Sequence, residues 1–252
     1  MTVRRRMVEK LEVLSFPDRI SMASAAADAI ADRLRDLIDR EGAARIVFGA
    51  APSQEDTLAN LVAAPGIDWS KVTAFHMDDY VDLPADADQR FANWLDARLF
   101  SRLPFGAVHR MAATGDPQAI ARDYATLLNA APLDIVVLGI GVNGHLAFND
   151  PPADLDDPRD VAIVTLDRIC RQQQVDDGAF DDIDAVPPRA ITLTVPRMLR
   201  ADRLFCVVPT EAKRDAVRAA LHGPVTGDCP ASALRSHPAC TLYLEPDSDP
   251  DA

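Results

Sequence analysis

Apolar positions recur along this chain with two periods, and each period predicts a different kind of element. Between residues 21 and 40 they return every three or four residues, as in an amphipathic helix, and Gly42 follows as a stop. Further helices are expected near 53–62, 90–101, 117–130 and 211–221. Short apolar runs predict strands at 44–50, 72–77, 133–140, 162–166, 190–195, 204–208 and 241–244.

Strands and helices alternate along the chain, and this order favours parallel βαβ units. We therefore predict a single α/β domain over residues 1–245, Rossmann-like, with a mostly parallel sheet and helices on both faces. The acidic, proline-containing stretch 246–252 is expected to be disordered. Ligands of such sheets bind beyond the carboxyl ends of the strands. The segments to inspect therefore follow Phe48, Met77, Ile140 and Val208.

The charge of the chain limits its partners. Its 252 residues include 26 Lys+Arg and 39 Asp+Glu, a formal net charge of −13. Nucleic acids and anionic membrane surfaces are not expected as partners, because both require a basic face. No apolar run approaches the length of a membrane span or follows the N-terminal arginines as in a secretory signal. The four cysteines show no C-x-x-C spacing, so we expect no metal site and a cytoplasmic protein.

The turn after the first long apolar strand is made of small residues that suit a bound phosphate. Gly49, Ala50 and Ser53 lie in it, and their backbone N–H groups are candidate anion donors. The alternative is an ordinary strand-to-helix turn in which Ser53 caps the helix. Glu55 follows directly, and it would repel an anion if it faced one.

Asp78 and Asp79 follow the next strand. Neighbouring side chains of an extended chain point to opposite sides, so only one of the two faces a given pocket unless the chain turns. One carboxylate then suits a general base and the other a turn or cap. Two solvated loop aspartates are the alternative.

The glycine-rich stretch 139–151 presents a single imidazole. Gly144 precedes His145, and Asn143 and Asp150 flank it in the sequence; an adjacent carboxylate or amide can fix the tautomer of a histidine. Such a histidine at a strand's carboxyl end is a candidate acid–base group, and a structural histidine is the alternative.

Two cations are candidates for an anionic ligand. Lys213, one of three lysines, lies at a predicted helix start, where the helix dipole disfavours a cation and a bound anion would explain it. Arg171 opens the polar run RQQQ. A surface lysine and a surface loop are the respective alternatives.

Four segments together resemble the glucosamine-6-phosphate deaminase/isomerase family. They are FHMDDYVDLP (75–84), LGIGVNGHLAFNDP (138–151), TEAKRDAV (210–217) and CPASALRSHP (229–238). The similarity runs from about residue 20 to 245. It implies a Rossmann-like fold and the conversion of glucosamine 6-phosphate, or an epimer, and water into a ketohexose 6-phosphate and ammonia. It implies no cofactor, a sugar phosphate as partner, and an oligomer as one possible assembly.

The resemblance also assigns roles to residues. Asp78 matches the base that moves a proton between C2 and C1, and His145 matches the group that opens the sugar ring. Asn143 and Asp150 match two carboxylates beside that histidine, where the family commonly has Asp and Glu. The resemblance also implies that the substrate is bound by Asp79, Gly144, Lys213 and the turn 49–53. The family's phosphate-binding arginine has no clear counterpart, and Arg171 is the expected replacement.

Two other functions compete with deamination. The related 6-phosphogluconolactonases share the G-x-G-x-D-G-H core, and in such a hydrolase His145 would activate water. Phe148 and Asn149 continue the motif as in the deaminases, which favours deamination. The amide at Asn143 and the altered phosphate turn instead suit a non-catalytic sugar-phosphate sensor.

Overall fold

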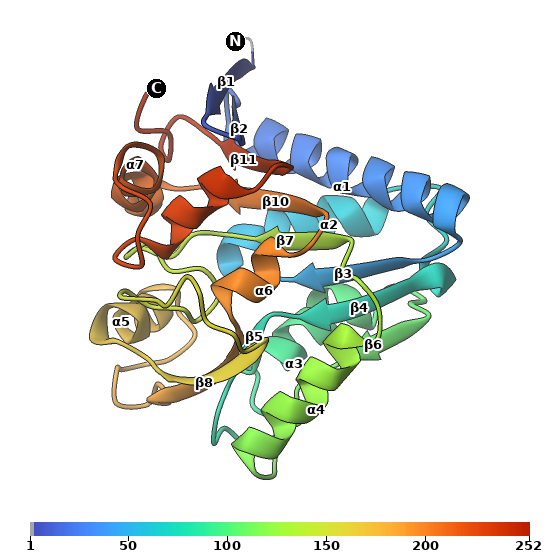
Figure 1. Cartoon of the computed structure of the whole chain (residues 1–252), viewed down its shortest axis with the longest axis vertical. Coiled ribbons are helices and arrows are strands. Elements are labelled where there is room, and N and C mark those ends of the chain that lie inside the picture. Colours follow the sequence, from blue (N-terminus) through green and yellow to red (C-terminus); the bar gives the residue numbers. More distant parts are fainter. Residues whose placement is uncertain (1–2) are drawn as a thin grey trace.

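A mostly parallel sheet of eight strands organises the computed structural model, which describes residues 3–252 (Figure 1). Its spatial order is β1-β2-β11-β10-β7-β3-β4-β6. Only the hairpin of β1 and β2 pairs antiparallel, and the other neighbours are parallel, as predicted. The strands are β1 (Arg4–Val8), β2 (Leu11–Ser15), β3 (Ala44–Phe48), β4 (Val72–His76), β6 (Ala107–His109), β7 (Ile135–Leu138), β10 (Arg203–Val208) and β11 (Cys240–Leu244).

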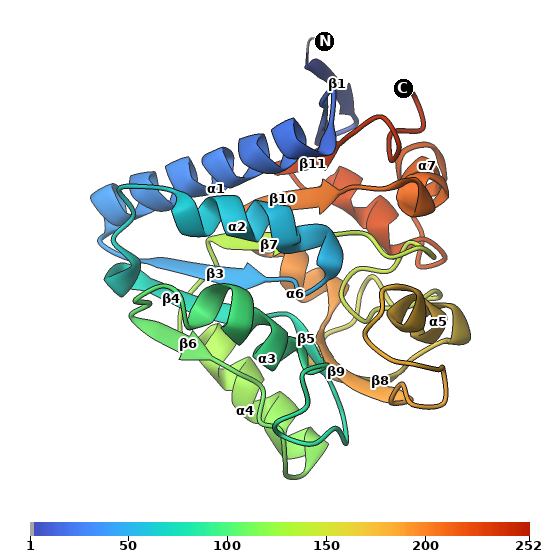
Figure 2. The same ribbon diagram turned by 180° about the vertical axis from the view of Figure 1, so that it is seen from behind.

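Helices cover both faces of this sheet because its strands are apolar on both sides (Figures 1 and 2). In β7, Ile135 and Val137 join one core, and Val136 and Leu138 join the other. The first core contains α1 (Arg19–Glu41), α2 (Glu55–Ala63) and α3 (Phe91–Leu95), and the second contains α4 (Pro117–Asn129), α6 (Val195–Leu199) and α7 (Arg214–His222). Within the described residues, no helix has the length and apolarity to cross a membrane.

Three further strands form a separate antiparallel sheet in the order β5-β9-β8. They are β5 (Asp78–Tyr80), β8 (Val161–Thr165) and β9 (Arg189–Leu193), and α5 (Arg168–Asp176) follows β8. The strands expected at 162–166 and 190–195 therefore exist, but they lie outside the parallel sheet. The chain leaves β4 through Met77 and pairs next with β9, where Asp78 lies opposite Thr192. This small sheet places Asp78 on a strand instead of on a loop.

The C-terminal tail is folded against the N-terminal hairpin, so the expected disorder of 246–252 is wrong. Asp249 is 1% exposed and pairs with Arg6 at 2.7 Å and with Arg4 at 3.0 Å. The hydroxyl of Ser15 also donates to its carboxylate. The acidic tail orders because the arginines of β1 and the hydroxyl of β2 satisfy a carboxylate that the sequence pattern alone would leave in water.

Replacing Asp249 with Asn should destabilise the protein. Burial raises the pKa of Asp249, but the hydrogen bonds from Arg6 and Ser15 outweigh burial and lower it, so the charged form contributes stability above its unfolded pKa. We expect a loss of about 1–3 kcal/mol in the free energy of unfolding, measured by denaturant titration at pH 7. The exposed neighbour Asp247 is the control, as Asp247→Asn. Equal midpoints for the two variants would contradict the role of the tail.

Candidate active site

A cavity of about 730 Å³ opens where β3, β4, β7 and β10 end. Its wall includes the segments after Phe48, Met77 and Ile140, and the segment after Val208 reaches it through Lys213. The carboxyl-end rule thus predicted the position of the cavity. Of the candidate site residues, the cavity brings together Gly49, Ala50, Ser53, Asp78, His145 and Lys213.

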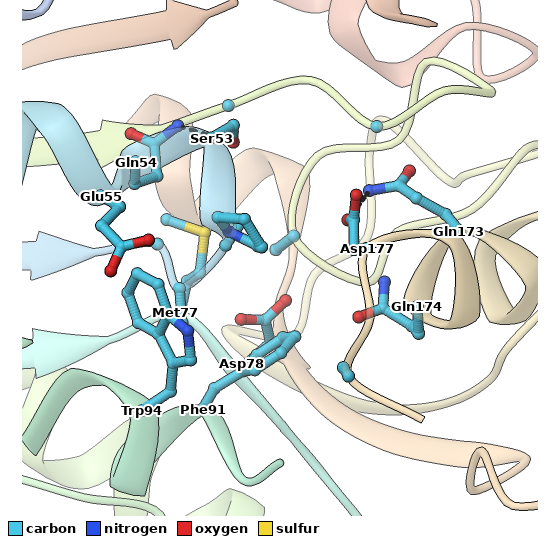
Figure 3. Close-up of a pocket in the computed structure, with 18 of the residues that line it drawn as sticks. Ser53, Gln54, Glu55, Met77, Asp78, Phe91, Trp94, Gln173, Gln174 and Asp177 are labelled. Atoms are coloured by element: carbon cyan, nitrogen blue, oxygen red, sulfur yellow. Dashed lines mark hydrogen bonds between the residues drawn. The ribbon is translucent and has the colours of Figure 1, made fainter. Parts of the chain in front are cut away.

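Asp78 points into this cavity (Figure 3), and no residue in the described range 3–252 pairs with its charge. Its carboxyl group is buried, with the residue 4% exposed. Burial, with a further contribution from the neighbouring charge of Asp79, raises the pKa of Asp78 well above its ordinary value. No hydrogen bond or cation from residues 3–252 opposes these two effects. A carboxylate held this way binds protons more readily near neutral pH, as a general base must.

Asp79 faces away from the cavity, as the alternation of strand side chains requires. Its carboxylate pairs with Arg90 at 2.9 Å, and both side chains are 2% exposed. The backbone N–H groups of Tyr80 and Phe91 donate to it as well. The expectation that Asp79 binds substrate is therefore wrong, because its lone pairs are used to hold β5 against the start of α3.

The His145 ring lies at the cavity wall with Asp150 behind it. The Nδ1 atom of His145 is 3.3 Å from Oδ1 of Asp150, a charge contact that falls short of hydrogen-bond geometry. Burial raises the pKa of Asp150, but His145, the Asp167 N–H and the Asn143 amide together outweigh burial and lower it. Asp150 is thus ionised and can stabilise a protonated imidazole.

Asn143 and the glycines shape the loop that carries His145. The Asn143 side chain donates to Asp150 at 3.1 Å and accepts from the backbone N–H of His145 at 3.1 Å. A Cβ on Gly141 would fall 2.1 Å from the imidazole, so only glycine fits beneath the ring. Gly144 has a φ of +86° and packs on Cys229. Asn143, Gly144 and Asp150 do not line the cavity, and Asn143 and Asp150 contact His145 and hold it in place.

The two predicted anion-binding cations have different surroundings. Lys213 lines the cavity and is 6% exposed. Burial lowers its pKa, and the charge of Asp177 partly offsets this effect. Arg171 does not reach the cavity, because its guanidinium donates to the backbone carbonyls of Ile183 and Val186. The prediction for Arg171 is therefore wrong.

Several cavity residues were not singled out by the sequence pattern. Polar members come from the turn after β3 and from α5, and aromatic members come from α3 and from the loop after His145. They include Gln54, Glu55, Phe91, Trp94, Phe148, Gln173, Gln174 and Asp177. The polar run 171–174 was noticed in the sequence, but its helical form was not, and helical spacing is what turns Gln173, Gln174 and Asp177 toward the cavity (Figure 3).

One group of side chains has the donor types of a metal site. The Nδ1 or Nε2 of His145, an oxygen of Asp150 and the Sγ of Cys170 lie within 4.8 Å of one another. Burial raises the pKa of the Cys170 thiol far above its ordinary value. A thiol that ligates a metal gives up its proton, so burial of Cys170 opposes metal binding at this cluster.

A buried carboxylate and a histidine–aspartate pair at the carboxyl ends of a parallel sheet define an acid–base site in an α/β protein. The chain belongs to the family described as glucosamine-6-phosphate isomerases/6-phosphogluconolactonase, whose model matches residues 17–243. The resemblance inferred from the four sequence segments is confirmed.

Named relatives are similar over nearly the whole chain. A glucosamine-6-phosphate deaminase of Mycolicibacterium smegmatis is 32% identical over 93% of this chain and 90% of its own length. One from Enterococcus faecalis is 31% identical over 80% and 85%. Among solved structures, a monomeric glucosamine-6-phosphate deaminase superposes with a TM-score of 0.87 at 25% identity, covering 94% of this chain and 98% of that one. These relatives support a deaminase-like activity.

Removing the charge of Asp78 should stabilise the folded protein at high pH and have little effect at low pH. Its folded-state pKa is raised, so the ionised form costs stability once the pH rises above the unfolded value. We expect Asp78→Asn to raise Tm by several degrees at pH 8 and little at pH 4. A pKa displaced by one corresponds to about 1.4 kcal/mol, and 1 kcal/mol moves Tm by roughly 2–4 °C in a chain of this size.

Thermal unfolding at both pH values measures this effect. The exposed helix residue Asp123 is the control, because Asp123→Asn should leave Tm unchanged. If Asp78→Asn gives no gain in Tm at pH 8, the ionised Asp78 carboxylate does not destabilise the folded protein.

Proposed function

We propose that this protein converts a 2-amino-2-deoxyhexose into a ketohexose and ammonia by acid–base aldose–ketose isomerisation. One observation carries the proposal: an unpaired buried carboxyl, Asp78, and an aspartate-backed imidazole, His145, line the same cavity. Two titratable groups in such different environments suit two separate proton transfers. The names of the relatives make glucosamine 6-phosphate, or an epimer, the reference substrate.

The first step opens the sugar ring. His145, in its protonated form, gives a proton to the ring oxygen while the C1 hydroxyl loses one, which leaves an open-chain aldehyde at C1. The imidazolium is stabilised at this point by the ionised carboxylate of Asp150, 3.3 Å from Nδ1. Asn143 contributes only by holding the loop and the Asp150 carboxylate, because an amide cannot accept the proton.

The second step moves the proton that deamination requires. Asp78 takes the proton from C2, the electron pair of the C2–H bond forms the C1–C2 double bond, and the electrons of the C1 carbonyl move to its oxygen, which regains from water the proton lost in the first step, so that an enaminol forms. The proton returns to C1, and C2 becomes an iminium carbon. Water adds to C2, and ammonia leaves with the C–N bond electrons to give the ketone. Neither an oxidant nor a reductant is needed, and every proton taken is returned.

The phosphate of the reference substrate would have Lys213 as its buried partner in the cavity. The turn 49–53 lines the same cavity, so its backbone N–H groups can supplement the ammonium. Binding of such a remote group can orient C1 and C2 against Asp78. Lys213 and this turn are the groups we propose for the 6-phosphate.

Substitution of either acid–base group should abolish most of the turnover. We expect Asp78→Asn and His145→Gln each to lower kcat by about 10²–10⁴-fold, the usual contribution of a positioned acid or base. Ammonia and ketose are measured together for free and phosphorylated glucosamine and galactosamine, with Asp123→Asn as the control. Ammonia release that survives Asp78→Asn would refute the base, and hydrolysis of a sugar lactone without ammonia would favour the lactonase function.

The acid limb of the pH profile should report Asp78. Because the base must be ionised and its pKa is raised, kcat/KM should fall as the pH drops at values well above the ordinary carboxyl pKa of about 3.9. The measurement is kcat/KM from pH 4 to 9 at constant ionic strength. An acid limb near pH 4 would mean that the base is a solvated carboxylate elsewhere.

A further inference from the structure

The side-chain amide of Asn143 lies between two carboxylates. Its nitrogen donates to Oδ1 of Asp150 at 3.1 Å and to Oδ2 of Asp167 at 3.3 Å. Its oxygen accepts the backbone N–H of His145 at 3.1 Å. A backbone N–H can only donate and a carboxylate can only accept, so the orientation of this amide is fixed. The loop therefore requires, at position 143, a side chain that donates on one side and accepts on the other.

Asp167 is the carboxylate on the far side of this amide, and both of its side-chain oxygens accept hydrogen bonds. Oδ1 accepts the backbone N–H of Cys170 at 2.7 Å, as the N-cap of α5. Oδ2 accepts from Asn143, and the backbone N–H of Asp167 donates to Oδ2 of Asp150 at 3.0 Å. Asp167 is thus linked to Asp150 twice, directly through its N–H and indirectly through the Asn143 amide.

These two links decide which oxygen of Asp150 faces the imidazole. Oδ1 accepts from Asn143 and lies 3.3 Å from Nδ1 of His145, while Oδ2 is held by the Asp167 N–H. A rotation of the Asp150 carboxylate would break both bonds, and a buried acceptor that loses its donor is costly. The contact behind His145 therefore depends on groups that Asp167 holds in place.

The helix that Asp167 caps also forms part of the cavity wall. The side-chain oxygen of Gln173 accepts the backbone N–H of Val142 at 2.9 Å, so α5 holds the loop before His145 at a second point. Gln173, Gln174 and Asp177 line the cavity from this helix and the residue that follows it (Figure 3). One element thus supports the imidazole from behind and faces the substrate in front.

We propose that Asp167 is a positioning residue for the His145–Asp150 pair and that it acts through the amide of Asn143. Asp167 does not line the cavity, so it has no direct contact with a ligand there. For the role of His145 this inference rests on the proposed function, and the alternative lactonase reaction uses the same imidazole. The network also gives a physical reason for the amide, because a carboxylate at position 143 would place its oxygen against those of Asp150 and Asp167.

Two single substitutions should break the link from opposite sides. Asn143→Asp keeps an oxygen for the His145 N–H, but it turns an acceptor toward Asp150 and Asp167. Asp167→Asn keeps an oxygen for the Cys170 N–H, and Asn caps helices as well as Asp does, but it turns a donor toward the nitrogen of Asn143. We expect each change to lower kcat by about tenfold or more, within the range of couplings between contacting residues. KM should change less, because neither residue lines the cavity.

The double variant Asn143→Asp Asp167→Asn exchanges donor and acceptor and should restore the bond. The new amide at position 167 can donate to the new carboxylate at position 143. We expect kcat and Tm to rise above those of Asn143→Asp, with kcat higher by about threefold or more. Recovery is partial, because the contact with Asp150 is not repaired. The matched control is Asp176→Asn, which removes an exposed carboxylate of α5 that accepts from the Gln172 amide, and it should leave kcat unchanged.

Ammonia release from glucosamine 6-phosphate and thermal unfolding are measured for all four variants and the wild type. A double variant with kcat no higher than that of Asn143→Asp would overturn the inference, even if its Tm recovers, since the bond would then only stabilise the fold. Asp167→Asn with the kcat of Asp176→Asn would overturn it too, and this comparison holds even if Asn143→Asp does not fold. A wild-type protein that releases no ammonia would refute the proposed function instead, and hydrolysis of a sugar lactone then provides the kcat that tests Asp167.

Discussion

The buried ion pair between Asp79 and Arg90 is the constraint on which the active site depends. Both side chains are 2% exposed, so the loss of either partner would leave a charge unpaired in the protein interior. Asp79 also accepts the N–H of Phe91 at the start of α3. This one carboxylate therefore fixes strand β5 and the helix whose Phe91 and Trp94 form the cavity wall. A single register then decides where the neighbouring Asp78 points.

That register creates two carboxyl groups with opposite properties from adjacent residues. Asp79 takes the available guanidinium, and Asp78 faces the cavity with burial and a neighbouring negative charge as its main influences. His145 lies in the opposite electrostatic environment, because the ionised carboxylate of Asp150 lies behind it and favours the protonated ring. In the proposed reaction, proton abstraction and ring opening therefore use two separate groups, each in an environment that suits its role. The rest of the wall adds polar side chains such as Gln54 and Asp177, and the buried ammonium of Lys213.

Much of the fold was predicted from the sequence because apolar runs are local signals. The position of the cavity then followed from the rule that ligands bind at the carboxyl ends of parallel strands. The hairpin of β1 and β2 was missed, since three consecutive arginines in β1 hide a strand whose charges pair with Asp249, over 240 residues away. Periodicity located the strands near 162 and 190 but carried no information on which sheet they join. At the site, motifs identified Asp78 and His145. The misassignment of Arg171 and the omission of Gln54 have one cause, because hydrogen bonds to distant backbone carbonyls decide where those side chains point.

In the proposed reaction, Asp78 removes the proton from C2 of an amino sugar. The most direct test uses an amino sugar carrying deuterium at C2 and follows both the label and ammonia by NMR. We expect deuterium to leave C2 at the rate of ammonia release, to appear at C1 or in the solvent, and to remain in place with Asp78→Asn. Ammonia release with the deuterium still on C2, as in direct displacement of the amine by water, would contradict isomerisation at this site, and loss of the deuterium without Asp78 would contradict the assigned base.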